Sequence, residues 1–491
     1  MRGPTMRLLS SLAARLNLRM RRWDFVSAYL QGELLEGEVV YCLPPPGHAT
    51  IGADGREQVL KVVKPIYGMA QAGRRWQRSL YPWMEEWKAD GASFTRLFCD
   101  TNVFMCKHEV DTPTGKRSEI LIVGVYVDDQ FVLYSHDDEH SLYSKYTSAL
   151  KARWAVEDEG AVSDLLGVDI TAADGYVELT QSSYIVRLAD VWFPDGVPET
   201  IQSNQPPADK NLPQLVADAL VNVDPRPPEQ VKAFQSLVGA LLYAAINTRP
   251  DVAYAVGMLC RAMAKPTPEL HAAALHVLGY LFRTREMGLR YQADDKPLYG
   301  MTDSDWAVKH STSGFVFMYN SAAITWGSKK QTSVALSSCE AELMAASLAA
   351  TEAVHLKAFL EELNVADDSP ISVACDNTAA RDTAYNPEHH QKVKHIERRH
   401  FYVRECVENH QITVPYVNTV HNLADFFTKP LEAKDFFRMR DVIMNVPKHS
   451  AFVSRMRRVA SLLCRGVDSI DGGVLADASI CYAHSACSYL G

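Results

Sequence analysis

Two neighbouring carboxylates stand between two apolar, strand-forming runs in the segment Tyr126-Val127-Asp128-Asp129. The runs, residues 120–125 and 130–134, predict a β-hairpin with both aspartates at or near its turn. Neighbouring carboxylates repel each other, and apolar surroundings exclude the water that would screen the repulsion. A divalent cation relieves that conflict, and magnesium prefers hard oxygen ligands of this kind. The alternative is a surface turn capped by the two aspartates, but runs this apolar on both sides favour metal chemistry.

Asp24 is a candidate partner for this pair. It lies at the end of a short β-prone stretch, directly before Phe25-Val26-Ser27-Ala28-Tyr29-Leu30. An acid in that position is the kind of third ligand that a metal-binding pair needs, whereas its alternative role is to cap the N-terminus of a helix.

Four further acids lie at the boundaries of predicted elements in the second half of the chain. A β-prone stretch ending near residue 303 and the strand-like runs 313–319 and 323–326 predict a three-stranded meander. A capping box at residues 337–340 predicts a helix that continues to Leu363, and residues 371–375 predict a buried strand. A further helix is predicted to begin at His421. Single acids at such boundaries are often caps, but functional groups of α/β sheets gather at strand ends. The four acids are Asp303, Glu342, Asp376 and Asp425.

Composition limits the classes of protein that this chain can belong to. The 491 residues are enough for two to four domains, and 47% hydrophobic and 22% charged residues are ordinary for a globular protein. The ten cysteines include no Cys-x-x-Cys pair, so we expect neither a zinc site nor a disulfide framework, and a reducing compartment. No apolar run is long enough to span a membrane. We expect an intracellular protein, in a cytoplasmic particle or the nucleus, without a secretion signal.

The net charge of −9 argues against a uniformly basic nucleic-acid binder. Local basic clusters can nevertheless follow a phosphate backbone on an acidic protein. Such clusters are Arg74-Arg75, the group Lys392, Lys394, Arg398 and Arg399, and the group Arg455, Arg457 and Arg458.

Changes in pattern along the chain predict five regions. The first, residues 1–195, mixes helix and strand signals and begins with an arginine-rich amphipathic helix, which a mitochondrial presequence would also resemble. Residues 196–230 are rich in proline and predict a linker or long surface loop. Residues 231–296 are helical in character and residues 297–444 form a second α/β block. We expect the tail, residues 445–491, to be disordered.

A set of ordered motifs closely resembles the reverse transcriptase of copia-type LTR retrotransposons. It comprises Asp24-x-x-x-Ala28-Tyr29-Leu30, Pro44-Pro45-Pro46-Gly47, Ile66-Tyr67-Gly68-Met69-Ala70-Gln71-Ala72-Gly73-Arg74-Arg75-Trp76 and Tyr126-Val127-Asp128-Asp129. The resemblance continues through Leu179-Thr180-Gln181-Ser182-Ser183-Tyr184 and Thr248-Arg249-Pro250-Asp251, and covers residues 4 to about 444.

The resemblance implies an α+β polymerase palm followed by a helical thumb or connection. Asp24, Asp128 and Asp129 would hold two magnesium ions, one activating the primer 3′-hydroxyl and the other holding the triphosphate. Tyr29 would be an aromatic gate that favours deoxynucleotides, or else a core residue. Gln71 and Gly68 match the segment that supports the template and the new base pair. Arg74 and Arg75 would contact phosphates, or else form an exposed basic helix end.

The chain departs from the family pattern in two ways. The family usually has lysine at the position of Ala70 and proline at the position of Gly73. It also has a fingers region that grips the triphosphate, whereas this chain starts inside the last fingers helix. The resemblance therefore implies an N-terminally truncated reverse transcriptase with weak or absent polymerase activity.

Motifs in the second half resemble the copia-type ribonuclease H domain. They are Thr302-Asp303-Ser304-Asp305-Trp306, Ser328-Lys329-Lys330-Gln331, Leu336-Ser337-Ser338-Cys339-Glu340-Ala341-Glu342-Leu343, Cys375-Asp376-Asn377 and Ala424-Asp425-Phe426-Phe427-Thr428-Lys429. The resemblance implies an α/β ribonuclease H-like domain in which Asp303, Glu342, Asp376 and Asp425 hold two magnesium ions, with manganese as an alternative. Lys394, His395 and His400 are candidates for hybrid contacts or local structure. His421 either assists proton transfer or product release, or is a solvated histidine at a helix start.

We therefore expect an RNA-directed DNA polymerase and RNA–DNA hybrid ribonuclease from a copia-type Pol polyprotein. The expected partners are an RNA template, a DNA primer, RNA–DNA hybrid, deoxynucleotide triphosphates and other element-encoded proteins, and no membrane. One alternative is a degenerate or co-opted remnant that binds nucleic acid without catalysis. Another is an unrelated two-domain metalloenzyme, which would require all the ordered motifs to be coincidental.

Overall fold

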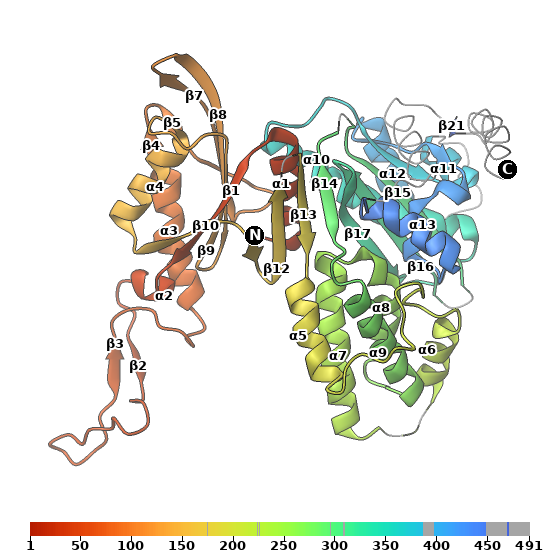
Figure 1. The fold of residues 1–491 in the computed structure, drawn as a ribbon, viewed down its shortest axis with the longest axis horizontal. Coiled ribbons are helices and arrows are strands. Elements are labelled where there is room, and N and C mark those ends of the chain that lie inside the picture. The colour runs from red at the N-terminus through yellow and green to blue at the C-terminus, as the bar shows by residue number, and fades with distance from the viewer. Residues whose placement is uncertain are drawn as a thin grey trace, which may run out of the picture. The chain divides into compact units, whose positions relative to one another are not determined.

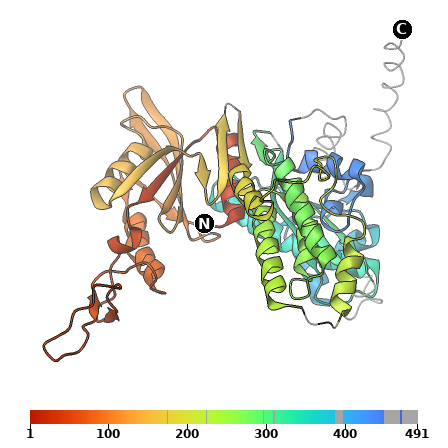
Figure 2. The same ribbon diagram turned by 60° about the horizontal axis from the view of Figure 1, so that its bottom comes forward.

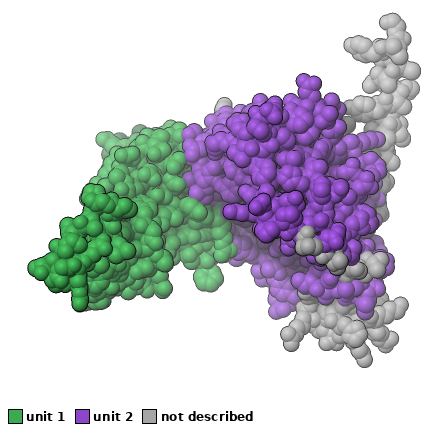
Figure 3. Space-filling model, turned by 90° about the horizontal axis from the view of Figure 1, so that it is seen from below, with its two compact units in different colours: residues 1–2, 17–162 green, residues 3–16, 163–491 purple. Residues whose placement is uncertain are grey.

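The computed structural model describes residues 1–173, 175–222, 224, 226–294, 296–307, 310–385, 397–447 and 469–470. The chain forms two compact units, shown in different colours in Figure 3. Unit 1 consists of residues 1–2 and 17–162, and unit 2 of residues 3–16 and 163–491. Most of the tail predicted to be disordered, residues 445–491, lies outside the described residues.

Unit 1 is built on a six-stranded antiparallel sheet (Figure 1). In spatial order its strands are β10 (Val156–Ala161), β1 (Arg19–Phe25), β9 (Asp129–Tyr134), β8 (Gly115–Tyr126), β7 (Val103–Thr112) and β6 (Thr95–Arg96). The predicted hairpin is confirmed, because β8 pairs with β9 and Asp128 lies in the turn between them. The unit also contains helices α2 (Ala28–Gln31), α3 (Ala72–Glu86) and α4 (Leu142–Arg153), and the short strand pairs β2 (Val40–Cys42) with β3 (Leu60–Val62) and β4 (Lys88–Ala89) with β5 (Ala92–Ser93).

Helices α3 and α4 bury one face of this sheet. Alternate strand residues enter the core together with side chains of both helices, as expected for strands whose successive side chains point to opposite faces. Trp76 of α3 lies at its centre, with its ring 4.8 Å from Phe25 and 5.1 Å from Trp154. Its Nε1 donates a hydrogen bond of 2.6 Å to the carbonyl of Val127, in the turn that carries Asp128. The core of unit 1 therefore positions the aspartate turn directly.

We predict that Trp76→Ala lowers the free energy of unfolding of unit 1 by about 3–5 kcal/mol, the cost of truncating a fully buried tryptophan. The measurement is urea unfolding followed by circular dichroism. Trp83 is a matched control, because it is only partly buried against the same core. Trp83→Ala costing as much as Trp76→Ala would contradict the central role of Trp76.

Unit 2 begins with α1 (Gly3–Leu16), which is separated in sequence from the rest of the unit. A small antiparallel sheet follows, in the order β11 (Asp164–Leu165), β12 (Val168–Ala173), β13 (Tyr176–Thr180) and β14 (Leu289–Gln292). Helices α5, α7, α8 and α9 lie side by side in Figures 1 and 2. The helices of this part are α5 (Ser182–Trp192), α6 (Leu212–Val221), α7 (Pro228–Asn247), the 3₁₀ turn η1 (Pro250–Val252), α8 (Ala253–Cys260) and α9 (Pro268–Arg283).

Helix α1 belongs to unit 2 because its buried side chains complete that unit's core. Arg7 donates hydrogen bonds to the carbonyls of Ile246 and Asn247, at 2.7 and 2.9 Å. These are the last carbonyls of α7, which have no donor within their own helix. The same side chain reaches the carbonyl of Ile324 at 2.6 Å. Burial lowers the pKa of Arg7 to about 10.

The units depart from the predicted regions in three places. The first predicted region ends at residue 195, but its last part, from Ser163 onward, and its opening helix both lie in unit 2. The proline-rich residues 196–230 are not a bare linker, since they contain α6, whose Leu212 and Val216 are buried. Helix α6 contacts α8 and α9. These contacts join segments distant in sequence, so the local proline pattern did not reveal them.

A mixed sheet forms the rest of unit 2. Its order is β17 (Ala322–Lys330), β16 (Thr312–Tyr319), β15 (Tyr299–Asp305), β18 (Ile371–Cys375), β20 (Tyr416–Val417) and β21 (Ser469–Ile470), and β19 (Ile412–Thr413) also pairs with β18. The predicted meander is confirmed as β15, β16 and β17, and the predicted buried strand as β18. The other elements are α10 (Ser338–Glu362), α11 (Thr378–Tyr385), α12 (Glu397–Glu408), the 3₁₀ turns η3 (Thr419–His421) and η4 (Leu423–Phe427), and α13 (Ala433–Ile443).

Helix α10 packs against β15, β16 and β18. Ser337 caps its N-terminus by accepting a hydrogen bond from the Glu340 amide, but the Glu340 carboxylate accepts from the Leu336 amide rather than from Ser337 as the predicted capping box requires. Contrary to the sequence analysis, α10 is long and apolar enough to cross a membrane by length and composition. However, 56% of its most apolar window is buried inside the protein, as in a core helix.

Candidate active sites

The backbone of unit 1 brings Asp24, Asp128 and Asp129 to one end of its sheet. Asp24, near the end of β1, pairs in register with Asp129, the first residue of β9. The carbonyl of Asp128 accepts a hydrogen bond of 2.9 Å from the amide of Phe25. Val127, directly before Asp128, has a φ of 58°, which β-branched residues rarely adopt. The turn is therefore held in a strained form by its contacts with β1 and α3.

Carboxylate repulsion is visible in the pKa values of this site. Burial, followed by the charges of Asp128 and Asp129, raises the pKa of Asp24 to about 6. Burial also raises the pKa of Asp129, although a hydrogen bond from Arg22 opposes it. Arg22 lies two residues before Asp24 on the same strand, and its Nη2 is 2.8 Å from Oδ1 of Asp129.

The three carboxylates of unit 1 are not one of the compact ligand groups found among the described residues, and Arg22 pairs with one of them, Asp129. Among the described residues, the groups whose ligand atoms all lie within 4.8 Å of one another are both in unit 2. An arginine that shares a face with Asp24, at the strand period of two, was the signal that the sequence analysis missed.

Tyr29, one of the predicted site residues, pairs with Tyr67 next to the carboxylates. Its ring centroid is 4.5 Å from that of Tyr67, and the ring is only partly buried against the core. Burial, followed by the charge of Asp128, raises the pKa of the Tyr67 hydroxyl. Gly73 faces the same tyrosine, because a Cβ there would lie 3.6 Å from the Tyr29 hydroxyl. The two tyrosines thus form an aromatic pair next to the carboxylates.

Two of the three predicted nucleic-acid contacts, Gln71 and Arg75, donate hydrogen bonds to an acid, Glu38. Glu38 accepts hydrogen bonds from Arg75 at 2.8 and 3.2 Å and from Gln71 at 3.2 Å. The Arg75 hydrogen bond is the main cause that lowers the pKa of Glu38 to about 2. Arg74 is exposed, and the Gly68 backbone has a φ of 94°, which glycine adopts without strain. Glu38 was missed because no local pattern links it to a helix that begins 34 residues later.

We predict that Glu38→Gln tightens the binding of single-stranded nucleic acid several-fold at low salt, because it releases Arg75 and Gln71 to phosphates. Fluorescence anisotropy with a labelled oligonucleotide across a series of salt concentrations measures the effect, which should steepen the salt dependence. Glu33→Gln is the control, since Glu33 is also close to α3 but contacts it through its backbone amide, which donates a hydrogen bond to the Ser79 hydroxyl. Unchanged affinity in Glu38→Gln would mean that Arg75 serves only the local fold.

Four acids from four elements of unit 2 converge on one place. Asp303 lies on β15, Glu342 on the first turns of α10, Asp376 just after β18 and Asp425 on η4. Asp303, Glu342 and Asp425 are 4%, 6% and 5% exposed, and Asp376 is half-buried. Asp303, Asp376 and Asp425 each offer a ligand atom within 4.8 Å of the others. The parallel pairing of β15 with β18 explains this, because it puts the ends of both strands at one edge of the sheet.

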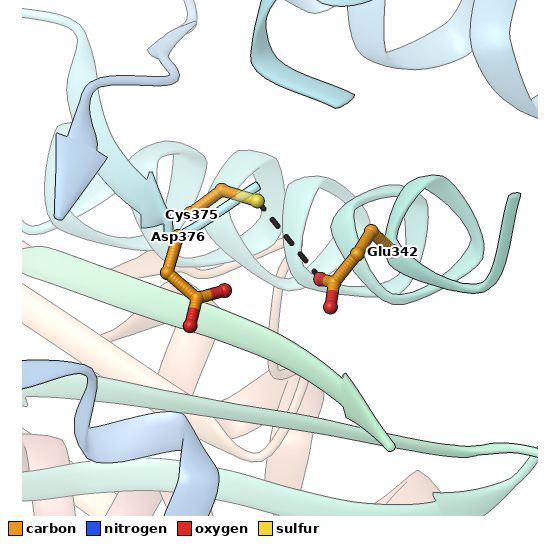
Figure 4. Close-up of side chains that lie close together, drawn as sticks. All are labelled: Glu342, Cys375 and Asp376. Carbon is orange, nitrogen blue, oxygen red and sulfur yellow. Dashed lines mark hydrogen bonds between the residues drawn. The ribbon is translucent and has the colours of Figure 1, made fainter. Parts of the chain in front are cut away.

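Glu342, Cys375 and Asp376 form a second group of ligand atoms within 4.8 Å of one another (Figure 4). Oε1 of Glu342 accepts a hydrogen bond of 3.2 Å from the amide of Ser304. The Cys375 thiol points toward the same carboxylate, with its Sγ 3.9 Å from Oε2. Asp376 belongs to both groups, so the four carboxylates form one continuous set of oxygen ligands.

The neighbouring residues fix the orientation of these acids. The Thr419 hydroxyl donates to Oδ2 of Asp376 at 2.7 Å, and the Thr428 hydroxyl donates to Oδ2 of Asp303. Burial, followed by the charges of Asp303 and Asp376, raises the pKa of Glu342 to about 9. Burial, followed by the charge of Asp303, raises the pKa of Asp425 to about 7. The site therefore concentrates negative charge that a cation would neutralise.

The donor set fits divalent metal ions. All four acids supply hard oxygen ligands, which magnesium and manganese prefer. One oxygen of Asp425, Oδ1, is buried without a hydrogen-bond partner in the part of the chain that the structure describes. A buried carboxylate oxygen without a donor is costly unless a cation meets it. Asp303, Glu342, Asp376 and Asp425 are therefore the residues that could hold metal in unit 2.

Comparisons with known proteins extend these observations. Residues 1–193 match a family described as "Reverse transcriptase (RNA-dependent DNA polymerase)". The chain is 29% identical over 447 residues to the retrovirus-related Pol polyprotein from transposon TNT 1-94 of Nicotiana tabacum. This match covers 89% of this chain and 32% of that protein. It is also 29% identical over 440 residues to the Pol polyprotein from transposon RE1 of Arabidopsis thaliana, with 89% of this chain and 28% of that protein covered. The chain therefore carries a reverse transcriptase family match over residues 1–193 and is similar to copia-type retrotransposon Pol polyproteins over most of its length.

The chain spans about a third of the length of these relatives. Among solved structures, it is similar to a foamy viral protease-reverse transcriptase in complex with double-stranded DNA, with a TM-score of 0.46 and 13% identity over 83% of this chain and 59% of that chain. A score this low supports no further conclusion.

Several candidate residues are not among the acids of the two carboxylate sites. His421 is buried in η3, so it is not the solvated histidine that was one of its alternatives. Lys394 and His395 lie outside the described residues, as does the side chain of His400. The sequence analysis missed Lys429, whose Nζ is 2.8 Å from Oδ2 of Asp425. Its spacing of four residues from Asp425 was the available signal.

Proposed function

We propose that unit 2 cleaves the RNA strand of RNA–DNA hybrids with the help of two divalent cations, magnesium or manganese. The observation that carries this proposal is the continuous set of oxygen ligands formed by Asp303, Glu342, Asp376 and Asp425, in which Asp376 belongs to both ligand groups. Two-metal hydrolysis of phosphodiesters needs a clamp of this kind around the attacking and leaving oxygens. The motif resemblance and the similarity to copia-type Pol polyproteins support the choice of hybrid as substrate.

The protein's own part in this reaction is to hold the ligands in fixed orientations. The bound metals would supply Lewis acidity for the attacking water and for the leaving 3′-oxygen. Thr428 orients Asp303, Thr419 orients Asp376 and the Ser304 amide orients Glu342. Such supporting hydrogen bonds lock side chains in productive rotamers and maintain ligand geometry.

We also propose that unit 1 carries an RNA-directed DNA polymerase site. Asp24, Asp128 and Asp129 would hold its two metals, and Tyr29, backed by Tyr67, would exclude the 2′-hydroxyl of a ribonucleotide. The family match of residues 1–193 supports this assignment. Its substrates would be an RNA template, a DNA primer and deoxynucleotide triphosphates. The Arg22–Asp129 pair must open or shift for metal to bind all three acids.

One gel tests both proposals. An RNA template annealed to a DNA primer, with each strand labelled separately, is incubated with magnesium, the full chain and all four deoxynucleotides. The Asp303→Asn, Asp128→Asn double variant is the blank. Shortened RNA shows the hydrolase and lengthened primer shows the polymerase. If the folded protein does neither, the alternative of a nucleic-acid-binding remnant without catalysis replaces both proposals.

A further inference from the structure

A lysine at the edge of the carboxylate set of unit 2 already forms an ion pair with one of its acids. Nζ of Lys429 is 2.8 Å from Oδ2 of Asp425. The Lys429 side chain is 36% exposed, whereas that of Asp425 is 7% exposed. The ammonium therefore approaches a buried acid from the solvent side, on a side chain that can also extend into water.

The other oxygen of Asp425 is in a different position. Oδ1 is buried and has no hydrogen-bond partner in the described part of the chain, while Asp303 and Asp376 each offer a ligand atom within 4.8 Å of Asp425. One oxygen of Asp425 is thus paired with Lys429, and the other has no hydrogen-bond partner among the described residues. A cation that enters among these three acids would meet both the unsatisfied oxygen and the lysine's positive charge.

We propose that Lys429 is a metal-gating residue: its ammonium competes with magnesium for Asp425 and so sets the magnesium concentration that the unit 2 site requires. The inference rests on the proposed function, in which Asp425 is a metal ligand. An ammonium and a divalent cation at the same carboxylate repel each other, and the low local dielectric strengthens that repulsion. Metal binding must therefore displace Lys429 or bear the repulsion.

The residue type suits this role. Lysine carries a compact point charge on a flexible stem, so it can leave Asp425 without rearranging other contacts. Arginine in its place would hold the carboxylate with a planar, bidentate fork. A lysine that only supported the fold would do the opposite of a competitor, because its loss would loosen Asp425 and weaken metal binding. The direction of the change in affinity therefore separates the two roles.

Isothermal titration of magnesium into the metal-free full chain tests the proposal. Asp24→Asn and Asp128→Asn form the background, so that the unit 1 carboxylates do not contribute. Lys429→Met should lower the dissociation constant by about tenfold, the size of one hydrogen bond between charged groups. Lys429→Gln should act in the same direction. Lys429→Arg should bind magnesium no more tightly than the background protein.

Lys434→Met is the matched control, since Lys434 is exposed on α13 close by in sequence. It should leave the dissociation constant unchanged. Unchanged or weaker magnesium binding by both folded Lys429 variants would overturn the gating role. If the wild-type chain still cleaves hybrid in that case, the proposed function survives and only this inference fails. If none of these proteins binds magnesium, both fail together.

Discussion

In the ribonuclease that we propose for unit 2, Asp303→Asn should lower the rate of RNA-strand cleavage by at least about a thousandfold, because the site loses the charge of a carboxylate that would hold the metal ions. Asp303 is 4% exposed, and one of its oxygens lies within 4.8 Å of ligand atoms of Asp376 and Asp425. Asparagine has the same shape and can still accept the hydrogen bond from Thr428. The loss should therefore come from chemistry and not from unfolding.

The measurement is the single-turnover rate on a labelled hybrid at saturating magnesium, with circular dichroism to confirm the fold. Asp305→Asn is the matched control, since Asp305 lies two residues further along β15 and is exposed. It should cut within about twofold of the wild type, because Asp305 belongs to neither group of ligand atoms. Equal loss in both variants, or cleavage retained in Asp303→Asn, would contradict the assignment of the site to these four acids.

Local sequence patterns predicted the elements that carry the carboxylates. The two apolar runs on either side of Asp128-Asp129 predicted the β8–β9 hairpin, and the three strand-like runs after residue 298 predicted the β15–β17 meander. Both depend on contacts between segments close in sequence, which neighbouring strand-forming runs indicate directly. The same holds for Asp376 at the end of the buried strand β18.

Contacts between distant segments could not be predicted in this way. Arg7 and Ile324 are 317 positions apart, so nothing near residue 7 indicates that α1 completes unit 2. The proline-rich segment 196–230 was predicted to be a linker or long surface loop. It contains α6 because that helix packs against α8 and α9, which lie later in the sequence.

The charged partners of the site acids are another feature that the sequence patterns did not predict. Arg22, Glu38 and Lys429 are ordinary charged residues whose roles depend on which acid or base they meet. One of them, Lys429, ended a sequence motif that also contains Asp425, but the motif did not indicate the contact. Acids were predicted from the chemistry that they can do, whereas counter-charges become visible only with geometry.

The metal-free protein loses stability as the pH rises from about 5 to about 9, and Glu342 is the main cause. Burial and the neighbouring acids Asp303 and Asp376 raise the pKa of Glu342 from its ordinary value of 4.5 to about 9. Between these values the folded protein binds a proton that the unfolded chain has released. Stability therefore falls with rising pH across this window, as linkage requires when the folded state holds more protons.

The expected loss is on the order of 6 kcal/mol over the whole window, at about 1.4 kcal/mol for each unit of pKa shift. Asp425, with its pKa raised to about 7, adds to the slope below neutral pH. Urea unfolding of unit 2 at pH 5, 7 and 9 in a chelating buffer, at roughly constant ionic strength, measures the slope.

Glu342→Gln should remove most of this slope and make the metal-free protein more stable than the wild type at pH 9, since a neutral amide has no charge to bury. Glu361→Gln, an exposed position on the same helix, should leave the slope intact. Magnesium should flatten the slope in the wild type but not change it in Glu342→Gln, because the cation replaces the proton as the partner of Glu342. A slope that persists in Glu342→Gln would mean that other titratable groups of unit 2 cause the pH dependence of stability. A wild-type slope that magnesium leaves unchanged would mean that Glu342 does not hold metal. The stability of the metal-free protein thus reports on the same carboxylate as the cleavage assay, without depending on any activity.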